Sequence, residues 1–96
     1  MPDELYSKRG HVLRLYITGA SVNSAKAISN IKKICEKYLK DAYQLEIIDV
    51  YQQPALAKQE QIVALPLLVK SYPLPVKRLV GNMSDTDKVL KGLELA

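Results

Sequence analysis

The chain of 96 residues lacks the side chains on which most redox and metal proteins depend. It has one cysteine, Cys35, one histidine, His11, and no tryptophan or phenylalanine. A single cysteine excludes an intrachain disulfide, a CxxC redox pair and a cysteine metal cluster. His11 has no second histidine or cysteine at metal-ligand spacing. We therefore expect neither a metal nor a cofactor.

Long hydrophobic runs and a secretory leader are also missing. No apolar run approaches the roughly 18 residues of a membrane helix. The first ten residues lack the charged start, apolar middle and small-residue cleavage site of a signal peptide. We expect a cytoplasmic protein with a flexible segment over residues 1–10 and a single domain over residues 11–96. One core of this size barely offsets chain entropy, so a dimer or tetramer would add stability.

Lysine and arginine outnumber acidic residues by 14 to 10, which gives a net charge of +4. Such an excess can indicate nucleic-acid binding, because bound Lys and Arg release counterions from phosphates. Here the basic residues are scattered, and four lysines between positions 32 and 40 have the spacing of a solvated helix side. No RNA-binding aromatic motif, glycine-rich clamp or zinc-finger spacing accompanies them. Neither nucleic acid nor membrane is expected as a partner.

The first half of the chain predicts a strand, a helix and a second strand. Residues 12–17 form an apolar run broken only by Arg14, as in a central strand. A helix is predicted over residues 24–40, capped by Asn23 or Ser21, with Cys35 on its apolar stripe as a core residue rather than a regulatory thiol. Residues 43–50 predict the second strand, parallel to the first through a right-handed crossover.

The second half is more ambiguous. Pro54 is predicted to open a short helix. Residues 62–69 are apolar except for Pro66, so periodicity does not distinguish a buried strand from a buried helix. The turn at residues 72–75 favours a hairpin between residues 67–71 and 76–80. Residues 84–87 resemble a capping box before a final helix, inside which Gly92 should cost about 1 kcal/mol relative to alanine.

This order of elements is typical of an α/β, thioredoxin-like domain, with Pro66 where such folds carry a proline beside the active-site loop. A thioredoxin carries its two redox cysteines in the turn after the first strand. Here that turn, residues 19–24, supplies only the hydroxyls of Ser21 and Ser24, which have no base nearby in the sequence. His11 belongs to the opposite end of the strand. We therefore do not expect an enzyme.

Six segments of the chain, in order and almost without gaps, resemble the KaiB family, the small partner proteins of the cyanobacterial circadian oscillator and of related systems. They are Leu-Tyr-Ile-Thr-Gly with Asn23-Ser24 downstream, the segment from Tyr43 to Val50, Gln53-Pro54-Ala-Leu56-Ala57, Ala64-Leu65-Pro66, Leu74-Pro75-Val76-Lys77-Arg78 and Lys88-Val89-Leu90-Lys91-Gly92-Leu93. The resemblance covers residues 11 to 95.

The resemblance implies a metamorphic protein whose C-terminal half switches fold. One state, usually a tetramer, packs that half differently, and the other is a thioredoxin-like monomer. The monomer of the family binds the N-terminal ring of a KaiC-type hexameric ATPase. That complex captures KaiA and competes with the thioredoxin-like sensor domain of a SasA-type histidine kinase.

The resemblance also implies two sets of functional residues. The partner-binding set is Lys26, Tyr43, Gln44, Lys70, Lys77 and Arg78, and the fold-switch or hinge set is His11, Pro66, Pro73, Pro75, Gly92 and Glu94. Within the first set, Lys77 and Arg78 are expected to steer the chain to an acidic ATPase surface. Replacing Gly92 by alanine is expected to favour whichever state uses its segment as a helix.

Several positions depart from the usual KaiB pattern. They are Lys26 in place of Arg, Gln61 and Glu46 in place of Lys, Leu65 in place of Thr, His11 in place of Tyr and Glu94 in place of Asp; the acidic C-terminal tail is also missing, because the chain stops at Ala96. These changes suggest a divergent paralogue in a stress-response or signalling system. Other readings are a self-assembling scaffold, the detached sensor domain of a kinase, and a thioredoxin-like redox protein.

Overall fold

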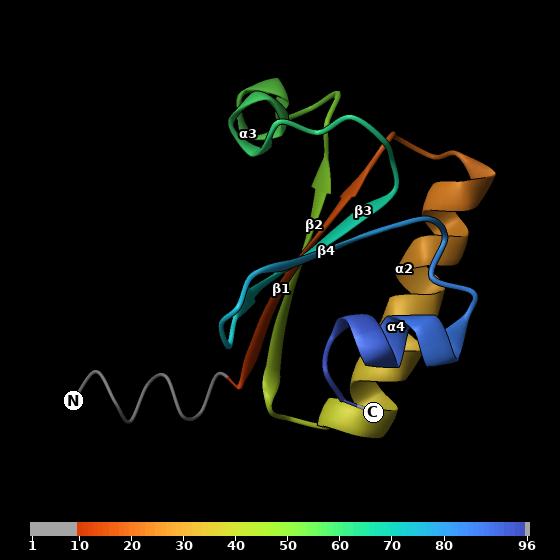
Figure 1. Cartoon of the computed structure of the whole chain (residues 1–96). Helices are drawn as coiled ribbons and strands as arrows, with labels where there is room; N and C mark the ends of the chain where they lie inside the picture. Colours follow the sequence, from red (N-terminus) through yellow and green to blue (C-terminus); the bar gives the residue numbers. More distant parts are fainter. Residues whose placement is uncertain (1–9, 96) are drawn as a thin grey trace.

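A computed structural model describes residues 10–95 (Figure 1). The elements are β1 (His11–Ile17), α2 (Val22–Ile34), the π-helical turn η1 (Cys35–Leu39), β2 (Tyr43–Asp49), α3 (Pro54–Glu60), β3 (Leu67–Tyr72), β4 (Lys77–Val80) and α4 (Thr86–Gly92). The flexible segment expected over residues 1–10 lies, apart from Gly10, outside the described residues. No helix among the residues described has the length and apolar character needed to cross a membrane.

The four strands form one sheet in the order β2-β1-β3-β4. β1 and β2 are parallel, as predicted, while β3 is antiparallel to both β1 and β4. The ambiguous apolar run therefore divides into a loop over residues 62–66 and the buried strand β3. Pro66 marks this division because it lacks the N–H that a strand interior needs. The predicted hairpin is confirmed.

The helix after β1 begins earlier and ends differently than predicted. Ser21, one of the two expected caps, accepts a hydrogen bond from the Ser24 N–H at 3.1 Å, so the helix starts at Val22. Its last turn, η1, is π-helical, and the Lys40 N–H closes it by donating to the Cys35 carbonyl at 2.8 Å. The predicted continuous helix to Lys40 is therefore corrected to an α-helix with a wider final turn.

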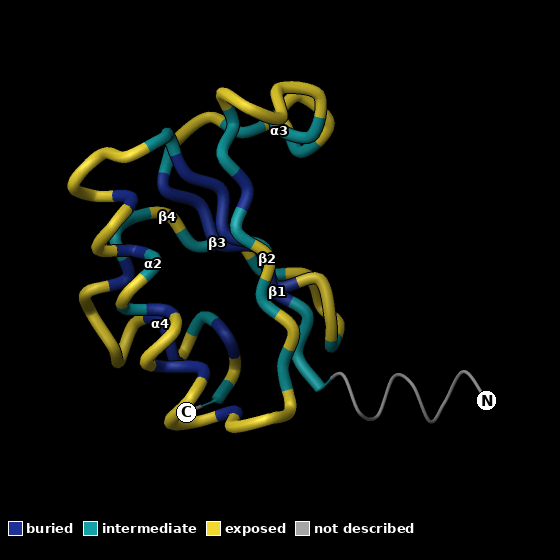
Figure 2. The backbone as a smooth tube through the Cα atoms, turned by 180° about the vertical axis from the view of Figure 1, so that it is seen from behind, coloured by how far each residue is buried: buried dark blue, intermediate teal, exposed yellow. Residues whose placement is uncertain are grey.

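The main core lies between the sheet and the layer formed by α2 and α4, which cover the same face (Figures 1 and 2). Leu13 and Leu15 of β1 are fully buried there against Ala27 and Ile31 of α2. Cys35 is also fully buried, and desolvation raises the pKa of its thiol to about 11. The burial of Cys35 confirms its predicted place in the core.

The opposite face of the sheet carries a smaller cluster. Tyr16, Ile48, Leu67 and Val69 are buried there, and the partly buried Leu56 of α3 packs against them. α3 begins with Pro54, as predicted, but none of its residues is fully buried. It sits at one end of the sheet, and within residues 10–95 no other helix covers this face (Figure 1).

One charged side chain, Lys70 of β3, is buried in the core, with 1% of its surface exposed. Its Nζ donates to the Oε1 of Glu94 at 3.2 Å, and Glu94 lies just beyond the end of α4. The Glu94 side chain keeps 49% of its surface exposed. Because an unpaired buried ammonium is strongly disfavoured, this pair holds the end of α4 against β3.

Gly92 is the last residue of α4, not an interior one as the sequence suggested. The helix begins after Asp85, whose side chain accepts from the Lys88 N–H at 3.1 Å. A β-carbon at Gly92 would lie 2.4 Å from the Cδ2 of Leu79 on β4. Glycine therefore allows the closest approach between α4 and the sheet, and an alanine there requires the Leu79 side chain to move.

We predict that Glu94→Ala destabilises this conformation by about 1–3 kcal/mol, because it leaves the buried Lys70 ammonium without a partner. Lys70→Met/Glu94→Ala should recover most of the loss, since a buried ion pair can be replaced by packed apolar groups at little cost. Urea unfolding followed by circular dichroism measures both effects. The matched control is Glu46→Ala, which breaks the exposed Arg14–Glu46 pair and should cost less than about 1 kcal/mol. Equal losses for Glu94→Ala and Glu46→Ala would contradict the prediction.

The contact between Gly92 and Leu79 gives a second prediction. In a Leu79→Ala background, where the β-carbon has room, Gly92→Ala should raise the stability of this fold by about 0.5–1 kcal/mol through helix propensity. In the unmodified chain the same substitution should be less favourable by about 1–3 kcal/mol, because Leu79 has to be displaced. A double-mutant cycle from urea unfolding gives this coupling energy. A coupling energy near zero would show that Leu79 does not limit the residue at position 92.

Candidate functional site

The turn after β1 lies where a thioredoxin carries its redox cysteines. Here serine hydroxyls occupy this turn and hydrogen-bond within it. The hydroxyl oxygens of Ser21 and Ser24 lie 2.7 Å apart, and the Thr18 N–H donates to the Ser24 Oγ at 3.2 Å. Ser24 is buried, so its hydroxyl is committed to the turn. His11 begins β1 whereas this turn follows the end of β1, so the histidine does not serve as a base for either serine.

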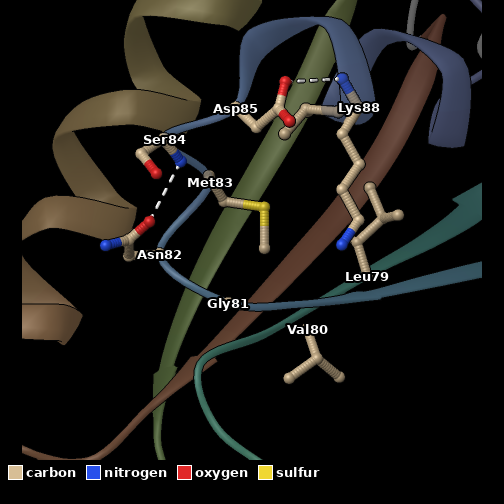
Figure 3. Close-up of a pocket in the computed structure, with 9 residues that line it drawn as sticks. Leu79, Val80, Gly81, Asn82, Met83, Ser84, Asp85 and Lys88 are labelled. Carbon is tan, nitrogen blue, oxygen red and sulfur yellow. Dashed lines mark hydrogen bonds between the residues drawn. The ribbon is translucent and has the colours of Figure 1, made fainter.

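No group of three or more His, Cys, Asp and Glu side chains within residues 10–95 is placed to hold a metal ion. A hollow of about 170 Å³ lies between the end of β4 and the start of α4 (Figure 3). Two of its polar side chains serve the local backbone: Asn82 Oδ1 accepts from the Ser84 N–H at 3.1 Å, and Asp85 caps α4. The side chains of Ser84 and Lys88 also line the hollow.

The predicted partner-binding residues do not form one cluster. Tyr43 and Gln44 begin β2, while Lys77 and Arg78 begin β4, at the opposite edge of the sheet. Lys26 is exposed in the first half of α2, and α2 follows the end of β1. Since Tyr43 pairs with the first residue of β1, Lys26 lies toward the other end of the domain. The structure thus spreads these residues over two sheet edges and one helix.

Lys70 requires a correction. The resemblance to the KaiB family implies a place for it on the partner-binding surface. The structure buries it and pairs it with Glu94 instead, so in this conformation it is not a surface contact. Alternation explains the position, because Leu68 and Lys70 point to the same side of β3 and that side is the main core.

The structure brings together two members of the predicted hinge set, His11 and Glu94, around Lys70. Partial burial, and then the positive charge of Lys70, lower the pKa of His11 below its ordinary value of 6.5. Because the folded-state pKa is below the unfolded one, the neutral histidine favours this fold above pH 6.5, and protonation at lower pH works against it. Lys70 therefore pairs with Glu94 at the end of α4 and disfavours the charged form of His11 on β1.

The prolines of the predicted hinge set lie in two connections. Pro66 directly precedes β3, and Pro73 and Pro75 lie in the turn between β3 and β4; all three follow cis peptide bonds. Gly92 ends α4 and Glu94 follows it. The connections on either side of β3 and the end of α4 thus carry most of the predicted hinge set.

Sequence reasoning missed two ion pairs on the face that α3 partly covers. Arg14 of β1 contacts Glu46 of β2 at 3.1 Å, and Arg78 of β4 contacts Glu60 of α3 at 2.6 Å. The Tyr16 hydroxyl also donates to Glu60, at 3.4 Å. The first pair had a signal in the sequence, because Arg14 interrupts an apolar strand. The second pair, between Arg78 and Glu60, joins residues 18 positions apart and had no such signal. Lys77 takes part in none of the ion pairs found among the described residues.

The fold is that of the thioredoxins. The N-terminal domain of SasA from Synechococcus elongatus superposes with a TM-score of 0.72 at 23% identity, over 92% of this chain and 87% of that domain. The thioredoxin Deadhead from Drosophila melanogaster superposes with a TM-score of 0.71 at 15% identity, over 97% of this chain and 86% of that protein. At these identities the likeness establishes a shared fold.

Sequence comparison is more specific. The KaiB domain family model matches residues 14–95. The circadian clock protein KaiB3 of Synechocystis is 54% identical over 84 residues, which are 88% of this chain and 82% of that protein. The circadian clock oscillator protein KaiB of Synechococcus elongatus is 42% identical over 88 residues, 92% of this chain and 86% of that protein. The chain therefore belongs to the KaiB family of circadian clock proteins.

Proposed function

We propose that this chain is a non-enzymatic, cytoplasmic regulatory protein that docks on a KaiC-type hexameric ATPase and modulates its phosphorylation or its signalling output. The observation that carries the proposal is a thioredoxin-like fold of the KaiB family in which hydroxyls occupy the redox turn. Ser21 and Ser24 bond to each other at 2.7 Å, and the lone thiol of Cys35 is buried. A scaffold of this kind acts through its surface rather than through bond chemistry.

Basic residues at the edge of the sheet support the docking. Lys77 and Arg78 are adjacent on β4, and Lys26 is exposed on α2. Cations at the rim of an interface raise the association rate with an acidic partner and fix its orientation more than they raise affinity. Tyr43 and Gln44 at the opposite edge would contact a second partner or a second face of the first. Lys70 has no part in this surface while it is paired with Glu94.

The partners of the proposed complex follow from the shared fold. The SasA N-terminal domain and this chain have the same architecture, so a SasA-type kinase can compete for one site on the ATPase. Capture of KaiA by the assembled complex belongs to the same proposal. Competition of this kind needs only that two similar surfaces fit one site, and the relative affinities then decide which protein is bound.

Fold switching is the regulatory part of the proposal. Two packings of one chain coexist only when their free energies differ by a few kcal/mol, and a partner then selects one by differential affinity. The buried ion pair of Lys70 and Glu94 and the close contact of Gly92 with Leu79 are candidate determinants of that difference. A self-associated dimer or tetramer would be the competing state.

A second candidate function is a stress-response or signalling paralogue that self-assembles and binds another target. The identity to KaiB3 of Synechocystis is 54%, whereas the clock oscillator KaiB proteins of Synechococcus elongatus and Picosynechococcus are 42% and 44% identical. The chain is therefore more similar to KaiB3 than to these two oscillator KaiB proteins. Glu46 stands where the family usually has a lysine, and it pairs with Arg14. β2 therefore carries less positive charge than is usual in the family.

We predict that the chain enters the hexamer peak slowly when it is incubated with a KaiC-type hexamer and ATP and sampled over hours by size-exclusion chromatography. Lys77→Ala should weaken the association roughly 3- to 10-fold and reduce its salt dependence, because it removes a cation at the rim. Lys33→Ala, an exposed lysine in the second half of α2, is the matched control and should bind normally. A stable oligomer that never enters the hexamer peak would refute the proposed function and favour the paralogue.

A further inference from the structure

β4 is an edge strand with backbone groups left over. It pairs with β3 on one side only, and no other strand among residues 10–95 lies beside it. Pro66 faces Gly81 in the same register, and the Gly81 N–H donates to the Pro66 carbonyl at 2.9 Å. Antiparallel pairs alternate between hydrogen-bonded and non-bonded, so Leu79 and Lys77 bond to β3. The N–H and C=O groups of Arg78 and Val80 therefore point outward, to the free edge.

On each face of β4 a cationic side chain is followed, two residues later, by an apolar one. Arg78 and Val80 share one face of β4, since they lie two residues apart and face Val69 and Leu67 of β3. Val80 has 53% of its surface exposed, and so does Val76, which directly precedes the strand. The cations Lys77 and Arg78 oppose pairing with a second copy of the same edge, because like charges would then lie close together. The exposed valines that flank them leave apolar surface for a strand that carries the opposite charge.

We propose that the free edge of β4 binds an extended segment of another protein in which a carboxylate alternates with apolar side chains. The segment would add a fifth strand to the sheet and bond to the backbone of Arg78 and Val80. Its carboxylate would accept from the Arg78 guanidinium, and an apolar residue two positions away would cover Val80. Backbone bonds then give affinity, and the alternating side chains give specificity.

A second copy of this chain fits the edge less well. Antiparallel pairing of two β4 strands places Arg78 opposite Val80 or opposite another Arg78, so neither guanidinium meets a carboxylate. β4 itself, residues Lys77–Val80, contains no acidic residue. A partner with a carboxylate at the matching position satisfies the charge that a second copy leaves unpaired.

The Arg78 guanidinium already has an ion-pair partner, because its Nη1 lies 2.6 Å from Oε2 of Glu60 on α3. A guanidinium has five N–H donors, so a partner carboxylate can share it with Glu60 or replace Glu60. Glu60 is therefore an internal competitor for the proposed partner. Removing its charge should strengthen binding, an effect that a purely structural role for Glu60 would not produce.

The test uses the intact, nitrogen-15-labelled chain and the synthetic peptide Thr-Val-Thr-Glu-Thr-Val-Thr, followed by amide NMR. We expect hydrogen exchange of the Arg78 and Val80 amides to slow when the peptide binds, while the Lys77 and Leu79 amides, already bonded to β3, do not change. A peptide with Gln in place of Glu should bind roughly tenfold more weakly. The inference shares Arg78 with the proposed docking function but is tested with no ATPase present, so either can fail alone.

Three variants complete the experiment. Arg78→Gln should weaken binding of the Glu peptide roughly tenfold and remove the preference for the Glu peptide over the Gln peptide. Glu60→Gln should tighten binding of the Glu peptide. Lys33→Gln, which removes a charge from α2, should have no effect. The inference is overturned by an absence of binding, by exchange protection at β2 instead of β4, by pairing of two chains through β4 in place of peptide binding, or by equal losses for Arg78→Gln and Lys33→Gln. Spectra of each free variant verify that it is folded.

Discussion

A buried lysine amine with one carboxylate partner determines how the C-terminal half of this protein packs. Lys70 lies on the core side of β3, and Glu94, beyond the end of α4, supplies the acceptor at 3.2 Å. An unpaired ammonium in that position would cost a substantial part of the roughly 5–15 kcal/mol by which a small domain is stable. The end of α4 must therefore stay on β3 for as long as Lys70 points inward. Because β4 pairs with β3 and Leu79 packs under Gly92, the position of one charged group fixes the hairpin and the last helix together.

The N-terminal half depends on a different kind of interaction. Leu13, Leu15 and Ile31 are fully buried without any charge among them, and local hydroxyls cap the helix. Apolar packing tolerates small changes in volume or position, whereas an ion pair in the core fails as soon as one partner moves away. The two halves of the domain therefore differ in the kind of change that would disrupt their packing. A single charge change at Lys70 or Glu94 acts on the C-terminal half and leaves the β1-α2-β2 unit in place.

The sequence predicts those parts of the fold in which the polarity of each residue indicates whether that residue is buried. The apolar periodicity of β1, α2 and β2 defines both element type and buried side, so these elements are found within a few residues of their positions. The run over residues 62–69 has no periodicity to read, because β3 is covered on both faces. The family resemblance implies a surface role for Lys70, and nothing in the sequence near it indicates its pairing with Glu94, 24 residues away. The pair between Arg78 and Glu60 was missed for the same reason, as was the close approach that makes Gly92 necessary.

The same reasoning limits any alternative packing of the C-terminal half. A second fold has to expose the Lys70 amine to water or bring another carboxylate to it. It also has to rebury Leu67, Leu68 and Val69 of β3. Exposure of Lys70 would place a further cation on the surface and free Glu94, so the two states would present different charges to a partner. An acidic partner that gains a contact with Lys70 would stabilise that second state, whereas one that contacts only Lys77 and Arg78 would leave the balance unchanged unless the second state also moves β4. If the chain switches fold as proposed, the charge distribution of each state, more than its shape, would decide which partner selects it.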